Sequence, residues 1–90
     1  MSIQVRVSLI LRQFTSNREL VDVACRTPIE CVKNFVKKFP DSRQWLYDEA
    51  GELQPQVWLF LNGQEVFPDE LNKPLNDGDE LFILLAIGGG

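Results

Sequence analysis

Apolar and polar residues alternate near the start of the chain. The apolar positions of this stretch are Ile3, Val5, Val7, Leu9 and Leu11. A period of two residues is typical of a half-buried strand, so the pattern predicts a strand over residues 3–11. The polar segment 13–18 predicts a turn, and a second alternation predicts a strand over residues 19–24. The chain is therefore expected to open with a β-hairpin.

The next segment has the period of a helix. Thr27-Pro28-Ile29-Glu30 has the sequence of a capping box with proline at the first helical position. In such a box the Thr27 hydroxyl accepts from the amide of residue 30, and Glu30 reaches back to the amide of residue 27. Apolar residues then recur every three or four positions, at Ile29, Val32, Phe35, Val36 and Phe39. Because Pro40 cannot continue a helix, the pattern predicts one amphipathic helix that ends before it.

Two further strands are predicted after a long connection. Residues 41–55 form this connection, and we expect a short helical turn at 42–46 whose Trp45 and Leu46 contact the edge of the core. The apolar run 57–61 precedes Asn62-Gly63, which is a strong hairpin-turn signal, so residues 64–66 are the expected return strand. Leu71 and Leu75 are expected to point inward. A second tight turn over residues 76–79 leads into the last strand.

This order of elements predicts the α+β class, with one main helix packed across a mixed sheet of four to five strands. The first and last strands would lie parallel at the centre, joined by a right-handed crossover. That is the β-grasp, or ubiquitin-like, arrangement. We expect a single domain over residues 1–90, with a globular part at about 1–86 and a flexible, protruding tail at 87–90.

Charge and composition exclude several classes of function. Nine basic and thirteen acidic residues give a net charge of −4, so the chain repels nucleic-acid phosphates. The basic cluster Lys33, Lys37 and Lys38 is interpreted as a solvated helix face. No apolar run reaches the roughly 18 residues of a membrane span, and the first residues lack the pattern of a signal peptide. We therefore expect a cytoplasmic protein that contacts neither nucleic acid nor membrane.

The chain is poor in the residues of catalysis. It has no histidine, which removes the usual general base and nucleophile pairings. Cys25 and Cys31 match no zinc or iron–sulfur spacing, and we interpret Cys31 as a partly buried structural thiol. We therefore expect no enzyme activity of its own, no metal and no tightly bound cofactor.

Three segments carry a resemblance to a known family. These are Phe60-Leu61-Asn62-Gly63-Gln64-Glu65-Val66, Leu75-Asn76-Asp77-Gly78-Asp79-Glu80-Leu81, and the strand from Ile83 that runs into Gly88-Gly89-Gly90. Together and in this order they resemble the ubiquitin-like sulfur carriers, which include MoaD, ThiS and CysO. Residues 39–51 are similar to the longer carriers of the CysO and MoaD kind. The chain departs from the molybdopterin type at Leu84-Leu85 and from CysO-like tails at Gly88, so the resemblance does not specify a pathway.

The resemblance implies a role for the C-terminal glycines. An adenylating enzyme similar to ThiF or MoeB would couple the Gly90 carboxylate to ATP, and a persulfide or sulfide donor would convert it to a thiocarboxylate. Gly89 would fit the narrow activating site, and Gly88 would extend the tether. The sulfur would pass to an acceptor enzyme or synthase subunit in molybdopterin, thiamine or sulfur amino acid biosynthesis. The chain would be a protein co-substrate, or the small subunit of a synthase such as molybdopterin synthase.

The resemblance also implies which sheet face meets these partners. Val57, Leu59, Leu61, Leu81 and Ile83 would face the helix, which leaves Trp58, Phe60, Phe82 and Leu84 outward. An exposed apolar patch with aromatic residues is typical of an interface. Alternatively, the 41–55 connection or a homodimer covers it. Two other functions also remain open: a ubiquitin-like modifier conjugated to lysines through Gly90, and a non-covalent β-grasp interaction domain.

Overall fold

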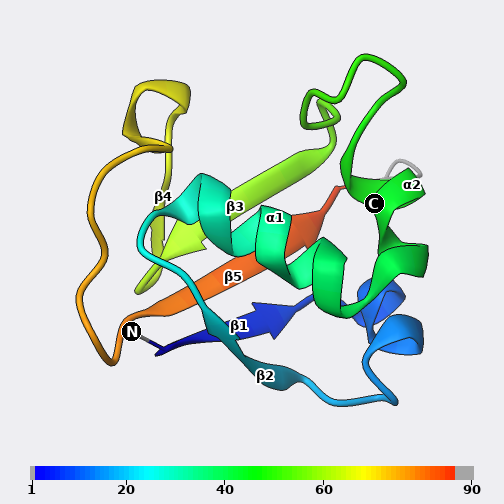
Figure 1. The fold of residues 1–90 in the computed structure, drawn as a ribbon, viewed down its shortest axis with the longest axis horizontal. Helices are drawn as coiled ribbons and strands as arrows, with labels where there is room; N and C mark the ends of the chain where they lie inside the picture. Colours follow the sequence, from blue (N-terminus) through cyan, green and yellow to red (C-terminus); the bar gives the residue numbers. More distant parts are fainter. Residues whose placement is uncertain (1, 87–90) are drawn as a thin grey trace.

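The computed structural model describes residues 2–86, and in it one helix crosses one face of a five-stranded sheet (Figure 1). The strand order is β2-β1-β5-β3-β4. β1 and β5 are parallel and central, and the other pairs are antiparallel. This confirms the predicted β-grasp fold. The elements of this core are β1 Ser2–Val7, β2 Leu20–Ala24, α1 Pro28–Lys38, β3 Val57–Leu61, β4 Gln64–Glu65 and β5 Glu80–Leu85.

The core lies between the sheet and α1. Alternate residues of the central strands are buried, and the side of α1 that carries Val32 and Phe35 packs on them. The short helix α2, Arg43–Leu46, adds the fully buried Leu46 and the partly buried Trp45, as predicted. Leu75 is buried and Leu71 packs against the core, which confirms their predicted inward direction.

The helix start differs from the predicted capping box in one bond. The Thr27 hydroxyl accepts from the Glu30 amide at 3.2 Å, and Pro28 is the first helical residue, as predicted. The Glu30 carboxylate, however, accepts from the amide of Arg26 at 2.7 Å rather than from that of Thr27. Thr27 has an extended backbone (φ −137°, ψ 159°), and the carboxylate reaches past it to the preceding residue. The start of α1 therefore has two side-chain caps.

The strand predicted over residues 3–11 is too long. β1 ends at Val7, and a 3₁₀ helix, η1, runs over Leu9–Phe14. β2 pairs with β1 only at residues 2–6, so the hairpin offers residues 9–11 no partner. In η1 the fully buried Leu11 enters the core, whereas Leu9 is 75% exposed. The two leucines therefore lie on different faces of η1, and not on one face of a strand as predicted.

The interpretation of Cys31 as a partly buried thiol is wrong, because Cys31 is fully buried and its sulfur is bonded to another cysteine. Cys25 and Cys31 form a disulfide, with a Cα–Cα distance of 5.1 Å. Cys25 follows β2 and Cys31 lies in the first turns of α1, and the sharp entry at Thr27 brings the two buried residues together. The bond therefore fastens the start of the helix to the end of a strand.

A tight hairpin turn and two short 3₁₀ helices complete the fold. Asn62 and Gly63 have positive φ angles of 49° and 86°, as a two-residue hairpin turn requires, and this confirms the predicted turn between β3 and β4. A 3₁₀ helix, η2, covers Pro40–Ser42, and another, η3, covers Pro68–Glu70. Within residues 2–86, no helix is long and apolar enough to cross a membrane.

Candidate docking face and tail base

Four apolar side chains form a strip on the sheet face opposite α1, which we call the outer strip. Trp58 and Phe60 come from β3, and Phe82 and Leu84 come from β5. The register places Phe60 opposite Phe82, with ring centroids 6.3 Å apart, and Trp58 opposite Leu84. Trp58 is 44% exposed and the other three are half-buried. Their outward direction is the one that the resemblance implied; their role in binding a partner stays a prediction.

Three of the four residues of the outer strip border a shallow hollow. Phe60, Phe82 and Leu84 line it together with Gly63, Arg6 and Glu80, and its volume is about 310 Å³. No residue of the 41–55 connection lines this hollow. Within residues 2–86, the face is therefore open at the hollow, and its floor is apolar with a charged edge.

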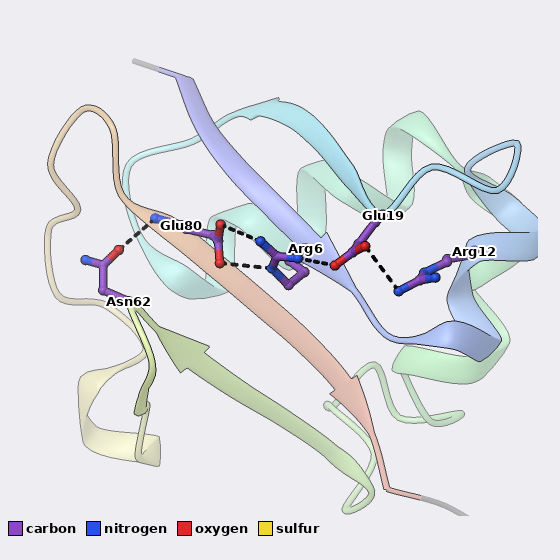
Figure 2. Close-up of polar contacts among 5 residues, drawn as sticks. All are labelled: Arg6, Arg12, Glu19, Asn62 and Glu80. Atoms are coloured by element: carbon purple, nitrogen blue, oxygen red, sulfur yellow. Dashed lines mark hydrogen bonds and ion pairs between the residues drawn. The ribbon is translucent and has the colours of Figure 1, made fainter.

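The charged edge is a row of ion pairs that the sequence did not predict (Figure 2). Arg6 Nε and Nη2 donate to the two carboxylate oxygens of Glu80 at 3.1 and 3.2 Å. Arg6 also pairs with Glu19, which lies 3.6 Å from Nη2 of Arg12. The hydrogen bonds that the Glu80 carboxylate accepts from Arg6 raise the pKa of Arg6 above its ordinary value. The alternation places Arg6 on the polar face, but only the β1–β5 register brings it to Glu80.

The two turns that carry the resemblance are bonded to each other. The Asn62 side chain donates to Asp79 Oδ1 at 3.0 Å and accepts from the Glu80 amide at 3.0 Å. The Asn62 amide in turn donates to the Glu80 carbonyl at 2.9 Å. Figure 2 shows Asn62 at one end of the polar row, beside Glu80. These bonds fix the start of β5 against the β3–β4 hairpin and so hold both sides of the outer strip in register.

The other end of β5 forms the base of the glycine tail. Beyond β1, Ser8 continues the pairing: its amide donates to the Ile83 carbonyl at 3.1 Å, and its hydroxyl accepts from the Leu85 amide at 3.3 Å. On the opposite side the Ala86 amide donates to the Gln56 carbonyl at 2.8 Å. The exposed Leu9 directly follows Ser8 in the sequence. Sequence reasoning missed Ser8 and Leu9 because they lay inside a strand predicted too long.

Gly88, Gly89 and Gly90 lie outside the described residues. Within residues 2–86, no group of three or more Cys, Asp or Glu side chains is arranged to hold a metal ion. The arrangement is suited to binding another protein.

The fold is shared with proteins of known structure. No protein-family model and no curated protein matches the chain. Among solved structures, the chain is similar to CysO of Amycolatopsis orientalis in a complex with BexX: 27% of residues are identical, 98% of this chain and 99% of that chain are covered, and the TM-score is 0.81. It is also similar to SAMP1 of Haloferax volcanii, with 20% identity, full coverage of both chains and a TM-score of 0.86.

A third similar structure is a complex of subunits 1 and 2 of the molybdopterin-converting factor from Helicobacter pylori, with 20% identity, full coverage and a TM-score of 0.65. SAMP1 and the Helicobacter protein, below 25% identity, support the fold. The CysO match adds sequence identity along almost the whole length. The resemblance to the ubiquitin-like sulfur carriers is thereby confirmed in structure.

Proposed function

We propose that this chain, which has the β-grasp fold of the ubiquitin-like sulfur carriers, is itself a sulfur carrier that works through the carboxylate of Gly90. The observation that supports the proposal most is the near full-length match to CysO, a protein crystallised in complex with BexX. The outer strip adds a second argument, because a carrier must dock on the enzymes that load and unload it. Leu84 of the outer strip lies six positions before Gly90 in the sequence.

The carboxylate of Gly90 is a poor acyl donor, so the proposed chemistry begins with its activation. A Gly90 carboxylate oxygen attacks the α-phosphorus of ATP on an adenylating enzyme similar to ThiF or MoeB, and pyrophosphate leaves. Sulfide then attacks the carbonyl carbon of the acyl-adenylate, AMP leaves, and a thiocarboxylate remains. ATP is bound by the enzyme, and the carrier needs no cofactor of its own. A persulfide donor would give an acyl disulfide, which a thiol would then have to reduce.

The described residues would supply the surface on which the partner docks, and they hold the end of β5 in place. Phe60 and Phe82 would anchor the outer strip on the partner, because a few large, desolvated side chains carry most of the binding energy of an interface. Ser8 and Gln56 bond Leu85 and Ala86 from the two sides, which fixes the position of the last described residues. The same surfaces would serve the acceptor that receives the sulfur.

The direct test is an intact-mass measurement. The carrier is incubated with the adenylating enzyme, ATP and sulfide, and we expect one oxygen to be replaced by one sulfur, located in the C-terminal peptide. A variant that lacks Gly90, and one with an alanine added after Gly90, should both fail to react. Both should unfold at the same temperature as the unaltered protein. Normal thiocarboxylate formation in the shortened variant would exclude the proposed role of Gly90.

A covalent modifier is the second candidate. The observation that favours it is the high TM-score of SAMP1, whose name describes a small archaeal modifier protein. A modifier would use the same adenylate, but a lysine amine of a target would attack it and form an isopeptide bond. Isolation of the cellular forms separates the two functions. A free thiocarboxylate supports the carrier, and higher-mass lysine conjugates support the modifier.

A further inference from the structure

A second hollow lies on the helix side of the molecule, away from the outer strip. It runs between α1, the connection that follows α2, and the residues around η3, and its volume is about 780 Å³. Ile29 and Val36 on α1 face Leu53 and Leu71 across it. All four are only partly buried, so apolar surface remains in contact with solvent at its floor. We call this feature the helix-side groove.

The rim of the groove is basic, in contrast to the molecule as a whole. Lys33 and Lys37 of α1 and Arg43 of α2 line it, and the one acidic lining residue is Glu52. The three basic side chains are exposed, and none forms an ion pair with another residue in the 2–86 range. The chain carries a net charge of −4, so this concentration of positive charge is local.

The spacing of these charges constrains what the groove binds. Residues four apart on a helix, such as Lys33 and Lys37, have Cβ atoms about 5–6 Å apart. Arg43 adds a third charge from another element. A single carboxylate contacts one or two of these groups, whereas a chain segment with several carboxylates meets all three. The apolar floor requires an apolar side chain between those carboxylates, because its burial supplies binding energy that charge alone does not.

We propose that the helix-side groove binds an acidic peptide segment of a partner protein, with an aliphatic or aromatic residue seated between Val36, Leu53 and Leu71. Figure 1 shows α1 over one face of the sheet; the groove is lined from this helix and the segments beside it, and it shares no lining residue with the outer strip. A partner held in the groove therefore leaves the outer strip free for another protein. The proposal goes beyond sulfur transfer and does not depend on it, since binding concerns the folded domain alone.

The test uses the complete chain and two short synthetic peptides. The probe has a central Leu-Phe pair flanked by Asp and Glu residues, and the matched control peptide has Lys in place of each acid. We expect the acidic peptide to shift the backbone amide resonances of residues 29–37, 47–53 and 71, and to bind less tightly as salt rises. Screening acts within about 10 Å at 0.1 M salt. The basic peptide should leave the spectrum unchanged.

Charge reversals on α1 provide the matched variants. Lys37→Glu should weaken binding of the acidic peptide by about tenfold, because a pair at the rim becomes a repulsion. Lys38→Glu makes the same change in net charge one residue away, but Lys38 is not in the groove and donates to the Asp22 carbonyl. That variant should bind within about twofold of the unaltered protein.

Three results would overturn the proposal. These are absence of any resonance shift at millimolar acidic peptide, equal loss of affinity in Lys37→Glu and Lys38→Glu, and equal binding of an acidic peptide whose Leu-Phe pair is replaced by Ser. The first result would mean that the groove does not bind the peptide. The second would mean that binding depends only on net charge, and the third that the apolar floor contributes nothing. Phe60→Ala, on the outer strip, should bind the peptide normally whether or not the chain carries sulfur.

Discussion

At the scale of single residues, Asp79 connects the two turns at the start of β5. Its carboxylate accepts from the Asn76 amide at 2.8 Å and from the Asn62 side chain at 3.0 Å. The Asn76 bond first, and the Asn62 bond second, lower the pKa of Asp79. A carboxyl group with a lowered folded-state pKa stabilises the fold above its unfolded-state pKa, and this contribution is lost as pH falls through the folded-state pKa.

This sign gives a prediction for acid unfolding. Asp79→Asn removes the titration, so we expect its melting temperature to fall less steeply than that of the unaltered protein as the pH drops below about 4. Some slope should remain, because the Phe67 amide and Lys73 also lower the pKa of Glu70. Melting curves between neutral and strongly acidic pH measure the effect. Asp77→Asn is the control, because the Asp77 carboxylate accepts no hydrogen bond within residues 2–86. If the melting temperature of this control depends on pH as weakly as that of Asp79→Asn, the role assigned to Asp79 is refuted.

Thr27 offers a prediction about helix capping. Thr27→Ala removes the acceptor of the Glu30 amide and should lower the free energy of unfolding by about 1 kcal/mol. Because α1 covers the single core, the loss should appear in global denaturant unfolding. Thr27→Ser keeps the hydroxyl and should cost much less. If alanine and serine have equal effects, the hydroxyl does not cap the helix.

At the scale of elements, the two faces of β3 should respond differently to truncation. Leu59 is 4% exposed, so Leu59→Ala should open a cavity and cost about 2–5 kcal/mol of stability. Phe60→Ala and Phe82→Ala leave no enclosed cavity and should cost much less. Each should, however, weaken binding to the proposed adenylating enzyme by about 2 kcal/mol or more if it anchors the outer strip. Thermal unfolding and partner affinity, measured on all three variants, distinguish the buried face from the outer face. A Phe60→Ala variant as unstable as Leu59→Ala would contradict the outward placement of Phe60.

The disulfide gives a second prediction about elements. Reduction of Cys25–Cys31 frees the start of α1 from the end of β2, and the loop it closes spans six positions. A loop this short predicts a loss of about 2 kcal/mol, which denaturant unfolding with and without a thiol reductant would measure. Unfolding curves that coincide would mean that the bond adds nothing to stability. Since disulfides are rare in the cytosol, the state of this pair in cells also tests the expected cytoplasmic location.

The sequence predicted elements where several signals agree and failed where one signal stood alone. Thr27, Pro28 and the apolar spacing together defined α1, and Asn62-Gly63 defined a hairpin turn. Residues 9–11 had only their apolar character, which continued the alternation of β1, but in the 3₁₀ helix Leu9 and Leu11 lie on different faces. The cysteine pair was missed because a distance of six positions does not reveal the turn that brings both thiols together.

At the scale of the whole molecule, topology could be predicted but contacts between distant elements could not. The order of strands and helix is enough to predict the β-grasp fold, since few arrangements bury all apolar faces. The Arg6–Glu80 pair and the bonds of Asn62 depend on strand register, which alternation leaves undetermined. The helix-side groove depends on how the connection after α2 lies against α1. The outer strip was predicted because the resemblance to the ubiquitin-like carriers implied which residues of β3 and β5, two strands that are apolar on both faces, face the helix.

The position of β5 has a consequence for how the molecule forms. β1 and β2 make one hairpin and β3 and β4 make another, and in the sheet formed by residues 2–86 β5 is the strand that joins them. Its pairing with β1 links Gln4 to Glu80, so the central ladder closes a loop of most of the chain. Closing so long a loop makes folding slow. Until residues 80–85 are synthesised, β1 and β3 each present an open edge that invites pairing with other chains. A chain broken off before β5 is therefore two unjoined hairpins prone to aggregate.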